Sequence, residues 1–142
     1  MLHCTGDVSL GRRGDEKQLQ GTVLFRFRSS LIRAWTVERG LLLLHHTGPP
    51  VRVVKVAAFD FSWNEKSPPS EPRGILWLDA PVEPQPAGWA LVRVPGEALR
   101  PLVADETRGL LVRLPRKWRV SSRDSLQNVP YMFAEGTPPS SR

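Results

Sequence analysis

The chain has 142 residues, a length that favours one domain with room for a single hydrophobic core. Its hydrophobic fraction of 40% and charged fraction of 24% are ordinary for a globular protein. The formal net charge of +6 favours an anionic partner such as nucleic acid, an acidic protein surface or a membrane headgroup layer, although the same charge also keeps small domains soluble. The single cysteine, Cys4, excludes an internal disulfide framework and fits a reducing compartment.

The apolar segments are too short for a membrane protein. The longest unbroken run of large aliphatic residues is Leu41 to Leu44, whereas a membrane-spanning helix needs about 20 apolar residues. Residues 1–14 contain no apolar core of signal-peptide length. We therefore expect a soluble, cytoplasmic protein without a membrane partner.

The domain organisation follows from composition. Residues 1–20 show no sustained periodicity and contain three glycines before position 20, so we expect a mobile arm or a weakly docked lead-in. Residues 21–133 are expected to form one β-rich domain, and residues 134–142 a flexible tail. The Pro-rich segment 62–73 is long for a loop inside a compact domain, which indicates a functional or disordered loop.

Short apolar segments with a two-residue period dominate the rest of the chain, and Gly and Pro separate them. The predicted strands are residues 22–28, 40–47, 51–61, 74–80, 89–95 and 109–115. Residues 81–88 are predicted to be a second Pro-rich loop, and residues 29–39 fit a helical turn and a strand equally well. The pattern is mainly β and indicates a small antiparallel barrel or sandwich of about six strands.

Helices are expected to be short. Residues 96–109 can form one helix, which Pro101 limits because its ring clashes with the preceding turn. A further helical turn is possible at residues 122–128. The fold class is therefore mainly β with one or two short helices.

The stretch from Gly40 to Phe61 has the strongest folding signal. Two apolar runs flank the sequence Thr47-Gly48-Pro49-Pro50, which predicts a β-hairpin or a tight β-corner. Its two histidines, His45 and His46, are adjacent, and adjacent side chains of a strand point to opposite faces. We therefore expect one histidine in the core and the other at the surface, with no shared metal ion.

Catalytic and cofactor motifs are missing from the sequence. No phosphate-binding glycine loop and no nucleophile elbow occurs, and the carboxylates are spread through loops. Metal binding would need several converging His, Cys or carboxylate ligands, which the pattern does not provide. We expect no cofactor, no metal and no enzymatic activity.

One constellation has a physical argument. Several predicted strands carry an arginine or a lysine between apolar neighbours. A basic segment with one tryptophan follows the last predicted strand. Like charges that face one another across a sheet destabilise it, and an anionic ligand offsets that repulsion. Basic residues with a stackable aromatic ring suit a nucleic-acid strand. The predicted anion-binding residues are Arg26, Arg28, Arg52, Lys55, Arg93, Arg113, Arg116, Lys117, Trp118 and Arg119. In the alternative interpretation the bases are scattered around the barrel and the tryptophan closes its end.

A second candidate surface lies near the end of the predicted domain. Tyr131, Met132 and Phe133 are three large residues in a row that either dock on the core or insert into a partner.

The leading functional hypothesis is a non-enzymatic module that binds nucleic acid, or an acidic protein surface of a larger complex, as a regulator within a nucleic-acid machine. The alternative is a protein-protein adaptor or inhibitor, for example of a polymerase-like complex. A third possibility, an enzyme using His45 or His46, predicts a rate step near pH 6.5, roughly the pKa of a free imidazole.

Overall fold

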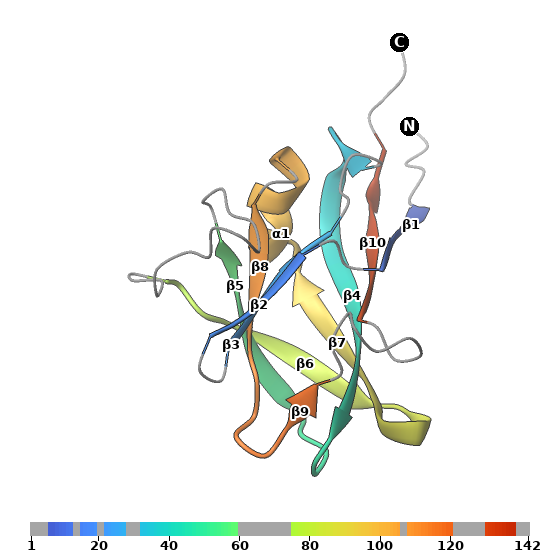
Figure 1. The fold of residues 1–142 in the computed structure, drawn as a ribbon. Helices are drawn as coiled ribbons and strands as arrows, with labels where there is room; N and C mark the ends of the chain where they lie inside the picture. Colours follow the sequence, from blue (N-terminus) through green and yellow to red (C-terminus); the bar gives the residue numbers. More distant parts are fainter. Residues whose placement is uncertain are drawn as a thin grey trace.

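The computed structural model describes residues 6–12, 15–19, 22–27, 32–59, 75–105, 108–120 and 130–138, with the backbone alone for 6–12, 15–19 and Arg26. The described residues form ten strands and one α-helix, which confirms the mainly β fold class (Figure 1). The strands are β1 (Gly6–Arg12), β2 (Asp15–Leu19), β3 (Thr22–Arg26), β4 (Thr36–Thr47), β5 (Val53–Phe59), β6 (Leu78–Pro84), β7 (Trp89–Pro95), β8 (Gly109–Arg113), β9 (Arg119–Val120) and β10 (Tyr131–Thr137). The helix α1 is Gly96–Ala104, and the short 3-10 turn η2 is Pro86–Gly88.

All strands belong to one antiparallel sheet that curls into a half-barrel (Figure 1). The strand order is β1-β10-β4-β7-β6-β5-β8-β3-β2, and β9 pairs with β4 off this path. The two edge strands, β1 and β2, are consecutive in the chain and are separated only by residues 13 and 14. Because three peptide units span at most roughly 11 Å, the curl brings the two edges close together at this link.

Five of the six predicted strands occur close to their predicted positions, as β3, β4, β5, β7 and β8. β4 begins at Thr36, which decides the ambiguous segment 29–39 in favour of a strand from that residue onward. The strand predicted at 74–80 is displaced to Leu78–Pro84, inside the segment predicted as a Pro-rich loop. There Ala80 and Val82 face the core and alternate with exposed residues, so the two-residue period continues through the prolines.

Additional strands lie in the segments predicted to be an arm and a tail. β1 and β2 occupy much of residues 6–19, where no strand was predicted, and β1 pairs with β10. The prediction of a flexible tail from residue 134 is wrong for residues 134–137, because β10 runs through Thr137 between β1 and β4. Its inward positions Ala134 and Gly136 are small, so they lack the apolar signal of a strand. The predicted loop 62–73 and the helical turn 122–128 lie outside the described residues.

The segment from Gly40 to Phe61 does not form a hairpin. β4 pairs with β10, β7 and β9, whereas β5 pairs with β6 and β8, so the two strands are not neighbours. The hairpin prediction is therefore wrong, and the second alternative, a tight corner, describes the connection. The turn after Thr47 carries the chain from one part of the curled sheet to another.

The main core fills the inside of the sheet, and α1 closes one end of it (Figure 1). Ala98, Leu99 and Leu102 of α1 are fully buried against β4, β5 and β8. Pro101 lies inside this helix, whose nine residues agree with the short helix predicted here. Burying each of the inward leucines of β4, Leu42 and Leu44, contributes about 1.5–3 kcal/mol. No helix in the described ranges has both the length and the apolar character needed to cross a membrane.

A second, smaller apolar cluster lies on the outer face of β3, β8 and β5. Its buried members are Leu24, Ala57, Phe59 and Leu111, and the partly buried Ile75 and Trp77 pack against it. These strands are therefore apolar on both faces over part of their length. This explains why the alternation within them is less regular than in β7.

Candidate anion-binding end of the half-barrel

Two turns meet at the end of the half-barrel opposite α1. In the first of them, residues 115–118, the backbone N–H of Trp118 donates a hydrogen bond of 3.0 Å to the carbonyl oxygen of Pro115. Gly48, in the turn between β4 and β5, has a φ of 115°. A Cβ at Gly48 would lie 2.5 Å from the carbonyl oxygen of Lys117. The two turns therefore touch through their backbones at a position that requires glycine.

Trp118 closes this end of the core. Its indole is only 5% exposed, and its Nε1 donates a hydrogen bond of 2.7 Å to the carbonyl oxygen of Pro49. The ring also stacks on the imidazole of His46, with centroids 3.6 Å apart and planes inclined by 10°. The prediction that Trp118 offers a stacking face to nucleic acid is therefore wrong for this structure, because packing and hydrogen bonding both turn the ring inward. The alternative prediction, that Trp118 closes the end of the barrel, describes its position.

The two histidines point to opposite faces of β4, as their adjacency predicts. His46 is buried, and its Nδ1 has no hydrogen-bond partner in the described part of the chain. Burial lowers the pKa of His46, because the charged imidazolium loses its hydration there. His45 faces outward, and its Nε2 lies 3.1 Å from the carbonyl oxygen of Ala87.

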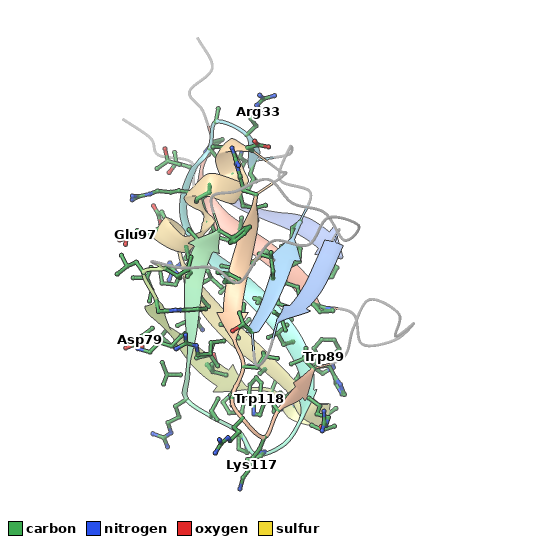
Figure 2. All side chains as sticks on the ribbon, turned by 60° about the vertical axis from the view of Figure 1, so that its left-hand side comes forward. Arg33, Asp79, Trp89, Glu97, Lys117 and Trp118 are labelled. Atoms are coloured by element: carbon green, nitrogen blue, oxygen red, sulfur yellow. The ribbon has the colours of Figure 1, made fainter. Side chains whose placement is uncertain are left out.

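Four cations lie on the two turns and on the strands next to them. Arg116 and Lys117 are the central residues of the 115–118 turn, and Arg119 pairs with Thr47 at the end of β4. The carbonyl oxygen of Arg52 accepts a hydrogen bond of 2.8 Å from the backbone of Val82. All four basic side chains are exposed, and none forms an ion pair with a described residue. We call this set, which comprises Arg52, Arg116, Lys117 and Arg119, the basic end; Lys117 marks it in Figure 2.

The basic residues predicted on the strands face outward, and two of them form ion pairs with carboxylates. Lys55 forms an ion pair with Asp79 on the neighbouring strand, and Arg93 pairs with Glu83 at 3.0 Å. Such exposed pairs contribute little to stability, yet they neutralise the local charge. The strand bases therefore do not form a bare cationic face.

Arg113 completes the strand set. It lies directly across from Lys55 in the sheet, and its guanidinium carbon is 4.2 Å from the centroid of the Trp77 ring. That cation–π contact offsets part of the repulsion between the two bases. The side chain of Arg26 and the whole of Arg28 lie outside the described residues.

The three large residues near the end of the domain are parts of a paired strand. Met132 is fully buried in the core, so its predicted role as a partner contact is wrong. Tyr131 and Phe133 point to the other face of β10 and remain partly exposed, with ring centroids 5.0 Å apart. The alternative prediction, docking on the core, therefore describes Met132 alone.

Comparison with known proteins adds no assignment: no family model matches the chain, and no curated protein matches it. Within the described ranges, no three His, Cys, Asp or Glu side chains converge to hold a metal ion.

Trp89 was given no functional role in the predictions from the sequence. It is partly exposed on the outer face at the start of β7 and lies toward the Lys117 end of the molecule (Figure 2). Its position at the head of an alternating strand is the signal that could have identified it.

Proposed function

We propose that the chain is a non-enzymatic module that binds nucleic acid, and that the basic end is its contact surface for phosphates. The observation that carries the proposal is the set of four exposed cations on two turns and on the strand β9 beside them, without carboxylate partners among the described residues. Three of the four are arginines, whose planar guanidinium can donate two parallel hydrogen bonds to one phosphate. The overall charge of +6 adds long-range attraction for a polyanion.

The local backbone supports this function because the turn that carries Arg116 and Lys117 is fixed before a ligand arrives. The turn bearing Arg116 and Lys117 is closed by its own hydrogen bond and is fixed to Pro49 through the Trp118 indole. A site organised in advance loses less conformational entropy on binding. Two neighbouring basic residues on a rigid turn suit a linear array of phosphates better than a single small anion.

The test is the salt dependence of binding, measured by fluorescence anisotropy with labelled oligonucleotides of 20 nucleotides, single-stranded and double-stranded. We expect log affinity to fall linearly with log salt, with a slope of about 0.7 to 0.9 per phosphate contact. The double variant Arg116→Gln/Lys117→Gln should reduce that slope by about 1 per lost contact and weaken binding to all sequences alike.

The matched control is Arg33→Gln/Arg100→Gln, which removes the same charge. Both residues are exposed, and Figure 2 shows Arg33 at the opposite end of the molecule. If the control flattens the salt slope as much as the Arg116/Lys117 variant, general charge rather than the basic end explains the binding. If neither duplex nor single strand binds with a salt dependence, the nucleic-acid function is wrong and the adaptor hypothesis replaces it.

A further inference from the structure

The outer face of β7, β4 and β10 carries a strip of half-buried aromatic and aliphatic side chains. Along each of these strands, buried residues alternate with residues that are partly exposed. The strand register sets Trp89 opposite His45, Leu91 opposite Leu43, and Leu43 opposite Tyr131. We call the outward set the aromatic strip; it comprises Trp89, His45, Leu43, Leu91, Tyr131 and Phe133.

The aromatic strip ends at the basic end. Arg119 pairs with Thr47, and paired residues of antiparallel strands share a face of the sheet. Thr47 and His45 are two residues apart on β4, a rise of about 6.8 Å along one face. Arg119 is therefore a diagonal neighbour of the His45 position. His45 in turn makes an edge-on contact with the Trp89 indole, with centroids 5.3 Å apart and planes at 74°.

A partly exposed indole beside cations that have no ion-pair partner in the described part of the chain is a combination suited to single-stranded nucleic acid. Phosphates follow the cations, while unstacked bases lie against aromatic rings. A duplex is less suited to such a ring, because its bases are already stacked on one another and would have to be separated at a cost of about a few kcal/mol per step. Trp89 is thus placed where the sequence predicted that Trp118 would act.

We infer that the ligand is single-stranded nucleic acid, with a base stacked on Trp89 and the adjoining phosphates held by the basic end. This inference rests on the proposed function, because it assumes that the basic end binds phosphates. It adds the strand state of the ligand and a residue that recognises its bases. The strip's other half-buried residues, Leu43 and Leu91, offer apolar surface to neighbouring bases.

The test compares a labelled oligo-dT of 20 nucleotides with an oligonucleotide of equal length whose central sites are abasic, so that the phosphates are retained but the bases are lost. The wild-type protein should bind oligo-dT more tightly by about five- to 150-fold per stacked base, with the same salt slope for both. Trp89→Leu should remove that preference and leave the salt slope unchanged. Trp89→Phe, which keeps an aromatic face, should retain part of it.

The control is Trp35→Leu, which removes another partly exposed tryptophan at the far end of β4. It should leave the preference for oligo-dT intact, and circular dichroism should show that every variant is folded. Equal affinity for abasic and base-bearing strands, with the salt dependence present, would overturn the stacking role while leaving the proposed function standing. The stacking role would also be overturned if Trp89→Leu and Trp89→Phe both bound oligo-dT like the wild-type protein. Loss of all salt-dependent binding would instead reject the proposed function itself.

Discussion

At one end of the half-barrel the helix α1 lays Leu99 and Leu102 over the core, whereas at the other end a single indole, Trp118, fills the opening. Near the helix, Arg39 forms an ion pair with Glu135, whereas Arg33 and Arg100 have no ion-pair partner among the described residues. At the basic end the cations have no described ion-pair partner, and a buried imidazole, His46, keeps an unsatisfied nitrogen. The difference indicates that one end is built from redundant aliphatic packing, while the other depends on few contacts that also position surface charge.

Replacing Trp118, whose indole closes the basic end of the core, should have the largest effect on stability. Trp118→Ala is expected to reduce the free energy of unfolding by about 3–5 kcal/mol, because it leaves a cavity and removes the bond to Pro49. Urea denaturation followed by circular dichroism measures this loss. Since the same side chain joins the two turns, oligonucleotide affinity should fall as well under conditions where the variant remains folded. A folded variant with wild-type affinity would show that Trp118 does not organise the basic end.

Shortening a buried side chain of α1 should be nearly as destabilising but should leave oligonucleotide binding unchanged. Leu99→Ala is expected to reduce the free energy of unfolding by about 2–5 kcal/mol through the cavity it creates. In the folded fraction, the salt slope of oligonucleotide binding should match that of wild type. A flattened slope in this variant would mean that the two ends are coupled and that packing at the helix end also affects phosphate binding.

The contact between the two turns can be tested at Gly48. Gly48→Ala is expected to cost about 1–3 kcal/mol, because a side chain is strained at a φ of 115° and would collide with the backbone of Lys117. Thermal or urea denaturation gives the cost, and anisotropy shows whether separating the turns weakens oligonucleotide binding. A variant as stable as wild type would contradict the close approach.

The buried histidine predicts a dependence of stability on pH. Because the pKa of His46 is lowered in the folded state, the unfolded chain takes up its proton first as the pH falls below about 6.5. The His46 contribution is therefore complete above this pH, is lost progressively as the pH falls toward the lower folded pKa, and then levels off. Urea titrations between pH 7.5 and 5 measure the loss. It should disappear in His46→Phe, which keeps an aromatic ring against Trp118, and persist in His45→Gln.

The compensated bases on the strands should matter least. Arg93→Gln breaks an exposed pair with Glu83 and is expected to change the free energy of unfolding by less than about 1 kcal/mol. If the basic end alone contacts phosphates, the salt slope should also stay at its wild-type value. A reduction of the slope by about 1 would extend the contact surface onto the sheet.

The sequence predicted the fold class well because one face of most strands is buried, so that apolar residues recur every second position, as in β7. It misplaced β6 and missed β10, because prolines in one and small inward residues in the other conceal the same period. The corner after β4 was left undecided since pairing between distant strands, rather than the turn residues, determines which strands are neighbours.

The candidate site was predictable in part. Arg52, Arg116, Lys117 and Arg119 were among the predicted residues. The structure places three of them on two turns that touch and Arg119 on the adjoining strand β9. Unlike these residues, Lys55 forms an ion pair with Asp79. That difference could not be predicted without the strand order, because Asp79 lies on the neighbouring strand. The inward turn of Trp118 depended likewise on the position of Pro49, far away in the sequence.

The insertion of β10 between β1 and β4 has a consequence for how the protein is made. β1 and β10 are more than 100 residues apart in the chain, so their pairing must wait until synthesis has passed Thr137. Until then, β1 and one side of β4 present unpaired backbone donors and acceptors, which invite pairing with other chains. β10 thus helps to protect the nascent protein from aggregation, and its loss would first reduce the yield of folded protein.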